Sequence, residues 1–179
     1  MKTTRLAGLG LAAVLSCAGA LLFGVGTPAS ADTADLTFST DTTEVTPGST
    51  VDLTVTLTNS QATEVRFVYQ SIRPTWETSR QPALTYTQVS CRSEGDPCKD
   101  DGSGRADGSG NLGLSYALPL APGESRSVTL TYRIAPDSAC GRELGFSSYL
   151  YYEYGGGLFS ASDTYWSPVF RVVCPAARS

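Results

Sequence analysis

The strongest constraint on the fold is a strict alternation of apolar and polar residues along short stretches of the chain. Val51, Leu53, Val55 and Leu57 alternate with aspartate and threonine, and Val65, Phe67 and Tyr69 continue the pattern in the next stretch. Successive side chains of a β-strand point to opposite faces, so a period of two predicts strands with one buried and one solvated face. The pattern recurs in residues 84–87, 114–118 and 128–134.

These stretches predict an all-β chain. Pro-Gly pairs and other turn residues separate the stretches at intervals of about ten residues, which is typical of antiparallel sandwiches. We therefore expect a two-sheet antiparallel sandwich of about seven to nine short strands rather than a closed barrel.

The C-terminal part of the chain predicts a β-hairpin. Residues 146–154 and 158–166 are equally long and flank Gly155-Gly156-Gly157. Glycine tolerates the positive φ that a tight turn needs, so we expect the strands to fold about Gly156. The expected pairs are Tyr152–Ser160, Leu150–Ser162, Phe146–Trp166, Tyr151–Ala161 and Tyr149–Asp163.

The first residues predict an export signal. Lys2 and Arg5 precede an apolar stretch over residues 6–25, and three small residues end at Ala31. This order is typical of a removable secretory signal. An uncleaved membrane anchor and a lipoprotein attached at Cys17 are the alternatives.

We accordingly expect a signal peptide over residues 1–31 and a single domain over residues 32–179. The domain would be secreted to the extracellular space, with no stable membrane insertion after cleavage.

The composition excludes several classes of function. The chain contains no histidine, which removes the commonest general base and the most frequent zinc ligand. It has 17 acidic residues against 13 basic ones, and Lys2 and Arg5 lie in the expected signal. This acidic balance argues against a nucleic-acid partner. We expect no cofactor.

Four cysteines follow the expected signal. An even number of cysteines in an exported domain predicts disulfides. Among three possible connectivities we favour Cys91–Cys98, which would close a polar turn, and Cys140–Cys174, which would bracket the C-terminal strands. A thiolate metal site is the alternative, but the spacing lacks the C-x-x-C pattern.

The hairpin carries the candidate partner-binding residues. A hairpin divides its aromatic side chains between two faces, so one set can fill the core while the other meets solvent. Exposed tyrosine and tryptophan give a rigid contact area for proteins or sugars, whereas cross-strand pairing that only stabilises the sheet is the alternative. The candidates are Tyr149, Tyr151, Tyr165 and Trp166.

A glycine-rich segment between Cys91 and Gly113 predicts a flexible surface loop. Clustered oxygen ligands on a flexible backbone suit Ca²⁺, but the spacing departs from the EF-hand template, so a solvated acidic loop is the alternative. The weak calcium candidates are Asp100, Asp101, Asp107 and Asn111.

Two stretches resemble the bacterial conserved-repeat, immunoglobulin-like modules related to cell adhesion. Residues 46–59 carry a Pro-Gly turn, a Val/Thr strand and a final Asn, and residues 120–136 look like the Leu-x-Pro-Gly-Glu turn and strand of that family. The resemblance spans residues 36–174. It implies an immunoglobulin-like sandwich found in secreted and surface proteins, and it supplies no catalytic residues.

These features predict a secreted, non-catalytic binding or adhesion-type module whose partner is an extracellular protein or a cell-wall polymer. A second hypothesis is a secreted inhibitor of a foreign extracellular enzyme, with Arg92 as its contact on the loop closed by Cys91 and Cys98. A third is a small glycan hydrolase that uses paired carboxylates. Its candidate carboxylates are Glu44, Glu64, Glu77, Glu143 and Glu153.

Overall fold

The computed structural model describes residues 35–93, 99–100 and 112–174. Their strands form three sheets. The four-stranded sheet has the order β1 (Asp35–Ser39), β3 (Thr50–Thr58), β8 (Ser125–Ile134), β5 (Tyr86–Ser93). The five-stranded sheet has the order β11 (Phe159–Trp166), β10 (Phe146–Tyr154), β4 (Val65–Pro74), β7 (Leu112–Leu114), β6 (Lys99–Asp100). A small third sheet has the order β2 (Glu44–Val45), β12 (Phe170–Val172), β9 (Glu143–Leu144).

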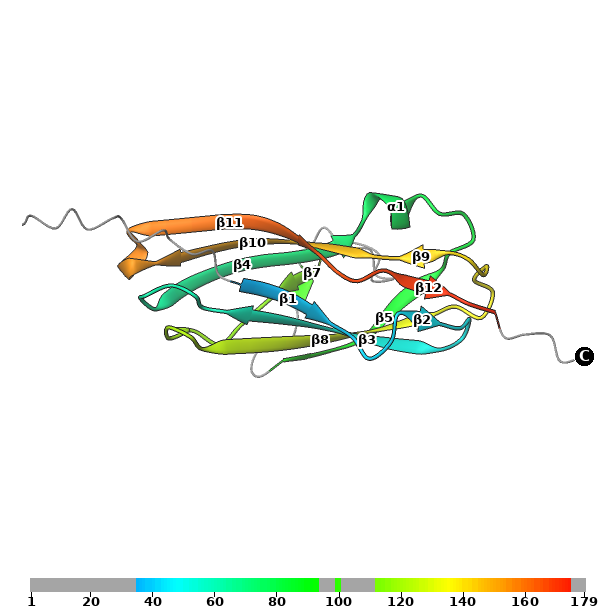
Figure 1. Cartoon of the computed structure of the whole chain (residues 1–179), viewed down its shortest axis with the longest axis horizontal. Coiled ribbons are helices and arrows are strands. Elements are labelled where there is room, and N and C mark those ends of the chain that lie inside the picture. The colour runs from blue at the N-terminus through cyan, green and yellow to red at the C-terminus, as the bar shows by residue number, and fades with distance from the viewer. Residues whose placement is uncertain (1–34, 94–98, 101–111, 175–179) are drawn as a thin grey trace, which may run out of the picture. The chain divides into compact units, whose positions relative to one another are not determined.

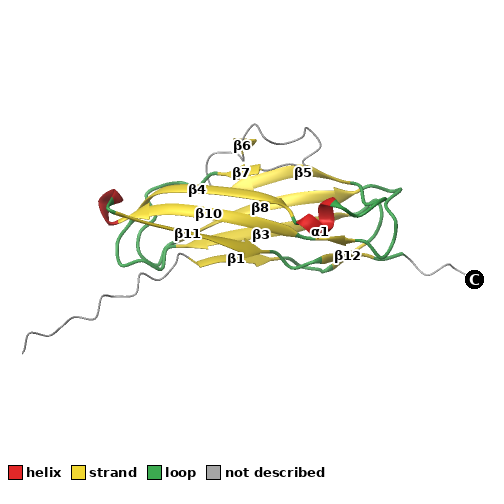
Figure 2. Ribbon diagram, turned by 90° about the horizontal axis from the view of Figure 1, so that it is seen from above, coloured by secondary structure: helices red, strands yellow, loops and turns green. Residues whose placement is uncertain are grey.

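The four- and five-stranded sheets lie face to face as the two layers of a sandwich (Figure 1). Viewed from above, the long strands of the two layers run in nearly the same direction (Figure 2). Neighbouring strands are antiparallel except β2 and β12, which are parallel. The predicted all-β, immunoglobulin-like sandwich is therefore confirmed. Of its twelve described strands, seven have five residues or more, and the rest have two or three.

The core lies between the two layers and follows the alternation of the sequence. On β3, Val51, Leu53, Val55 and Leu57 are all buried, as the period of two predicts. Apolar residues of β8, β4 and β10 meet them from the same and the opposite layer. The two layers also share a ring stack, because Tyr132 of β8 packs on Phe146 of β10 with centroids 4.3 Å apart.

The two stretches that resemble the conserved-repeat modules lie side by side. They supply β3 and β8, which pair along all of β3 and along Ser125 to Arg133 of β8. Asn59, fully buried at the end of β3, donates from Nδ2 to the carbonyls of Thr63 and Leu120 at 2.9 and 2.8 Å, and its Oδ1 accepts from the amide of Gln61. The amide of Gly123 donates to the Asn59 carbonyl. The motif residues therefore fasten two turns to each other.

The predicted hairpin is confirmed, but its predicted register is wrong by one residue. Tyr154 pairs with Phe159, so Tyr149 lies opposite Thr164 rather than Asp163, and Tyr152 lies opposite Ala161 rather than Ser160. The remaining expected pairs shift likewise, to Leu150–Asp163, Ser147–Trp166 and Tyr151–Ser162. The cause is the turn, η1 (Gly155–Gly157): all three glycines have positive φ, and Leu158 follows them as a fourth loop residue, 81% exposed, instead of starting the strand.

The predicted disulfide Cys140–Cys174 is confirmed, with Cα atoms 5.5 Å apart. It joins the chain just before β9 to the chain just after β12 and so closes the small third sheet. Cys98 lies outside the described residues, and the Cys91–Cys98 pairing stays a prediction. The expected signal peptide also lies outside them. Among the described residues, no helix has the length and apolar character needed to cross a membrane.

Candidate functional site

The outer face of the five-stranded sheet carries a row of exposed aromatic rings, which we call the aromatic ladder: Phe67 and Tyr69 of β4 and Tyr149 and Tyr151 of β10. Phe67 is 47% exposed, Tyr69 45% and Tyr149 41%, and Tyr151 is half-buried between its neighbours. In the strand register Tyr151 lies directly opposite Tyr69. The ladder is therefore a continuous apolar surface on two neighbouring strands.

The rings support one another across the strands. The centroids of Phe67 and Tyr151 are 6.0 Å apart in an edge-to-face arrangement, and those of Tyr69 and Tyr149 are 6.2 Å apart in a tilted one. Both distances fall in the range where aromatic pairs attract. The Tyr151 hydroxyl donates to Glu153 Oε1 at 2.9 Å, which fixes that ring further. These contacts hold the rings of the ladder in place although no other part of the described chain covers them.

A β-bulge in β4 is what turns Phe67 and Tyr69 outward. Phe67 pairs with Glu153 and Val65 with Tyr154, so Arg66 is an extra residue with no partner on β10. One extra residue reverses the alternation, because side chains of a strand change face with every residue. Val65 is consequently buried, whereas Phe67 and Tyr69 are exposed. The expectation that all three residues share one face is therefore wrong.

The predicted partner-binding residues divide between two faces. Tyr149 and Tyr151 lie in the ladder, and Trp166 at the end of β11 is 68% exposed. Tyr165 lies elsewhere: its side chain packs against the hydrophobic core. Adjacent residues of a strand point to opposite faces, so Tyr165 and Trp166 cannot share a surface.

Sequence reasoning missed Phe67, Tyr69 and Trp76 as surface residues. Phe67 and Tyr69 continue the alternation that begins at Val65, which predicts that they are buried with it. No residue type in the sequence indicates that a bulge at Arg66 moves them to the outer face. Trp76 follows Pro74-Thr75, where the strand ends and the short helix α1 (Trp76–Ser79) begins. The proline two residues before Trp76 was the signal for its exposure. A tryptophan just after the end of a strand lies on a short surface segment, where little apolar core is in reach of its ring.

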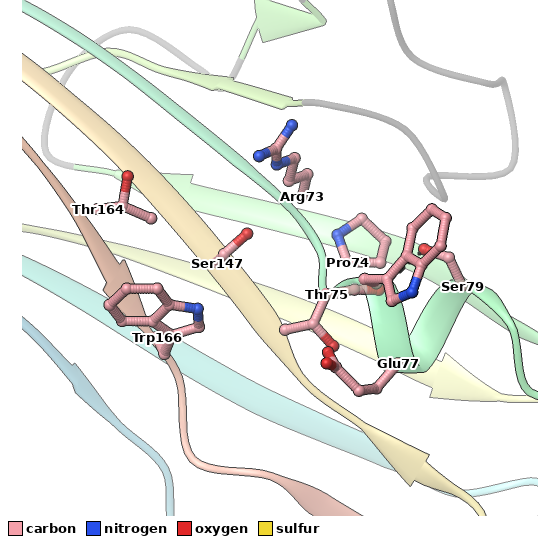
Figure 3. Close-up of a pocket in the computed structure, with 9 residues that line it drawn as sticks. Arg73, Pro74, Thr75, Glu77, Ser79, Ser147, Thr164 and Trp166 are labelled. Carbon is pink, nitrogen blue, oxygen red and sulfur yellow. Dashed lines mark hydrogen bonds between the residues drawn. The ribbon is translucent and has the colours of Figure 1, made fainter.

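A polar groove lies beside the ladder, between α1 and the C-terminal end of β11 (Figure 3). Its volume is about 490 Å³. Its lining includes Arg73, Trp76, Glu77, Ser147, Thr164 and Trp166. Arg73 pairs with Ser147, and Ser147 pairs with Trp166, so these three residues form one row across β4, β10 and β11.

The outer face of the four-stranded sheet has a different character. Its threonine and serine hydroxyls bond to one another across the strands, as in the pairs Thr54–Thr129 at 3.0 Å and Thr56–Ser127 at 2.9 Å. Asp52 accepts from the Thr131 hydroxyl and forms an ion pair with Arg92 at 3.0 Å. These hydroxyl and carboxylate groups therefore already have partners within the domain.

The other predicted sites find less support in the described residues. Asp101, Asp107 and Asn111 of the calcium candidate lie outside them, and Asp100 is described only as part of the backbone of β6. In the described part of the chain no three acidic or cysteine side chains group as a metal site. Arg92, the expected inhibitor contact, is exposed at the end of β5 and is held by Asp52.

The five candidate carboxylates are spread over different elements. Glu64 forms an ion pair with Arg66, Glu77 lies on α1, and Glu153 accepts from Tyr151. Glu44 and Glu143 lie on β2 and β9, and Arg171 of β12 pairs with both of them in the strand register. The cationic Arg171 thus lies between Glu44 and Glu143 in the strand order of the small sheet.

Comparison with known proteins supports the fold. No family model matches the sequence, and no curated protein matches it. Solved structures do resemble it. The sixth cohesin of scaffoldin B from Acetivibrio cellulolyticus, in complex with a mutant Cel5 dockerin, has a TM-score of 0.54 at 12% identity over 78% of this chain and 99% of that chain. A cohesin module from a family 33 glycoside hydrolase of Clostridium perfringens has a TM-score of 0.50 at 12% identity over 78% and 96%.

A putative membrane anchored protein from Corynebacterium diphtheriae also matches, with a TM-score of 0.52 at 17% identity over 83% of this chain but 37% of that chain. Similarity at such identities establishes the fold alone, a cohesin-like β-sandwich. The sandwich implied by the conserved-repeat resemblance is therefore confirmed, whereas membership of that family gains no support from the sequence comparisons.

Proposed function

We propose that this domain is a non-catalytic, secreted module that binds an extracellular protein through the aromatic ladder. The observation that carries the proposal is the outward, mutually supported arrangement of Phe67, Tyr69, Tyr149 and Tyr151. Contiguous exposed apolar surface marks interaction sites on soluble proteins, and tyrosine is enriched among the residues that dominate binding energy.

The rigidity of the ladder favours recognition of a folded partner. Rings that are already held by Phe67–Tyr151 and Tyr69–Tyr149 contacts lose little conformational freedom when a partner covers them. The hydroxyl groups of Tyr69 and Tyr149 lie at the polar tips of these rings and can bond to groups at the edge of an interface.

Two further observations support this partner class. On the opposite face of the sandwich, hydroxyl groups bond to one another, as in Thr54–Thr129 and Thr56–Ser127. The ladder is therefore the outer face better suited to bind a partner. Cohesins share the sandwich, and one of them is seen in complex with a dockerin, which is a property of that protein. The expected export signal supports a partner outside the cell.

The test is capture of a protein from the producer's culture supernatant by the immobilised, oxidised domain. The double variant Tyr149→Ser/Tyr151→Ser should bind any captured protein at least about tenfold more weakly, since hot-spot rings each contribute 1 kcal/mol or more. Val89→Ser is the matched control, because Val89 is 44% exposed on β5, away from the ladder. This control should bind like the wild type.

Two results would contradict the proposal. One is capture that survives loss of both tyrosines, and the other is ladder-dependent retention on the producer's cell walls with no captured protein. The second result would assign the surface to a wall polymer instead.

A further inference from the structure

The polar groove beside the ladder has an unusual lining. The chain contains two tryptophans, and both border this groove. Trp76 is 67% exposed and Trp166 is 68% exposed, so neither ring contributes much to the core. Trp76 belongs to α1, which follows β4, whereas Trp166 ends β11 on the other side of β10. The groove lies over β10, and one indole borders it on each side of that strand.

The helix that carries Trp76 is fixed to the sheet. Thr75 caps α1 by accepting from the Thr78 amide, and its own amide donates to the Gly145 carbonyl at 2.9 Å. The buried Thr78 hydroxyl accepts from the Gly145 amide at 2.8 Å. On the outer side, the Arg80 guanidinium lies 4.1 Å from the centroid of the Trp76 ring. The wall of the groove is thus preorganised although α1 has four residues.

Several polar side chains of the groove have no hydrogen-bond partner within the described part of the chain: those of Arg73, Glu77, Ser147 and Thr164 and both indole N–H groups. The hydroxyls of Thr75 and Ser79 also line the groove, but they already bond within α1 and its cap. On the opposite sheet, by contrast, Thr54 and Thr129 bond to each other. Figure 3 shows Ser147 between Thr164 and the start of α1, and Arg73 and Glu77 point in different directions. Donors and acceptors therefore remain available to a bound molecule.

The charge of the lining favours a neutral ligand. Arg73 and Glu77 supply one charge of each sign, and the other polar groups are hydroxyls and indole N–H groups. A polyanion would meet the Glu77 carboxylate, and a polycation would meet Arg73 and the neighbouring Arg80. A neutral polyol can accept from the guanidinium and donate to the carboxylate at once.

From this combination we propose that the groove binds a segment of a neutral glycan. The C–H groups on one face of a pyranose ring pack on an exposed indole, while ring hydroxyls bond to Arg73, Glu77, Ser147 and Thr164. The volume of about 490 Å³ lies within the range of small-molecule sites. Glu77 is the single carboxylate among the described lining residues, whereas glycoside cleavage uses two, so the site binds without cleaving.

The experiment uses the two tryptophans as reporters. Their emission, excited where tyrosine does not absorb, comes from the groove alone, because the chain has no other tryptophan. The oxidised domain is titrated with cellohexaose and chitohexaose as neutral probes, and with oligogalacturonate and a proline-rich peptide as comparison probes. We expect a saturable emission change with a neutral glycan, no change with either comparison probe, and intact glycan after incubation.

Calorimetric titration of variants then assigns the binding to the groove. Trp76→Ala and Trp166→Ala should each weaken glycan binding at least tenfold, and Trp166→Phe should retain part of it. Phe67→Ser, at the far end of the ladder, should bind the glycan like the wild type. Thermal unfolding of each variant confirms that it is folded.

The inference is overturned if neither neutral glycan binds, if the comparison probes bind instead, or if both Trp→Ala variants keep wild-type affinity. Because the ladder and groove variants are separate, loss of protein capture and loss of glycan binding can be told apart.

Discussion

Phe67 on β4 and Tyr151 on β10 lie edge to face on the outer surface of the sandwich, with ring centroids 6.0 Å apart and ring planes inclined by 69°. This contact exists because the extra residue Arg66 reverses the alternation of β4. A single bulge therefore moves two rings from the expected core to the surface, and it creates the candidate interface.

The hairpin turn should distinguish two adjacent glycines. Gly155 has φ 61° and Gly156 has φ 71°, so alanine at either position costs about 1 to 2 kcal/mol in the left-handed region. A Cβ at Gly155 would also lie 2.7 Å from the Phe159 ring, which stacks on Tyr154, whereas a Cβ at Gly156 meets nothing within 4 Å. Gly155→Ala should therefore destabilise the domain more than Gly156→Ala in urea unfolding. Equal losses would contradict the observed turn.

Asn59 should be among the most sensitive polar residues. Asn59→Asp would place a carboxylate oxygen against the carbonyls of Thr63 and Leu120. Asn59→Ala would remove the Nδ2 donor from both carbonyls and the Oδ1 acceptor from the Gln61 amide, although the Leu120 carbonyl keeps its bond from the Val65 amide. We expect either change to lower the free energy of unfolding by about 3 kcal/mol or more. Thr58→Ala, which loses an exposed hydroxyl pair with Ser125, should cost below about 1 kcal/mol. Similar costs for both positions would refute this role.

The disulfide at the third sheet should contribute strongly to stability. Cys140 and Cys174 are 34 residues apart, and closing a loop of that length stabilises by about 4 kcal/mol through the unfolded state. We expect Cys140→Ala/Cys174→Ala to unfold at a lower urea concentration with an unchanged β-type circular dichroism spectrum at low urea. The double variant is used rather than reduction, because a reductant would also act on the predicted Cys91–Cys98 bridge. An unchanged midpoint would contradict the prediction.

Alkaline pH should destabilise the domain through Tyr132. Burial, and secondarily the neighbouring Tyr86, raise the pKa of Tyr132 above its ordinary value near 10. The unfolded chain therefore releases this proton first, so the stabilisation is complete below about pH 10 and falls as the pH rises further. For each protein the free energy of unfolding is compared with its own value at pH 7. Above pH 10, this free energy should fall less for Tyr132→Phe than for the wild type, by up to about 1.4 kcal/mol per pH unit. Parallel stability curves for the two proteins would exclude this cause.

The sequence predicts those parts of the fold that depend on local periodicity. The inward residues of β3 and β8, the hairpin and the Cys140–Cys174 bridge all follow from alternation, glycine position and cysteine count. The register of the hairpin does not, because Leu158 joins the turn only through the dihedral angles of the three glycines before it.

The candidate site is only partly predictable for a similar reason. Tyr149 and Tyr151 can be assigned to one face from their spacing, whereas Phe67 and Tyr69 need the pairing of β4 with β10, which exposes the bulge. The row of Arg73, Ser147 and Trp166 joins three strands and depends on two registers at once.

The most direct test of the ladder as a protein interface is site-specific photo-crosslinking in the producer's culture supernatant. Benzoylphenylalanine is placed at Tyr69, inside the ladder, or at Val89 on β5, which has similar exposure. We predict a discrete protein adduct from position 69 that is absent from position 89 and is lost when Tyr149→Ser is added. No adduct from position 69, or the same adduct from both positions, would contradict the ladder as the binding surface.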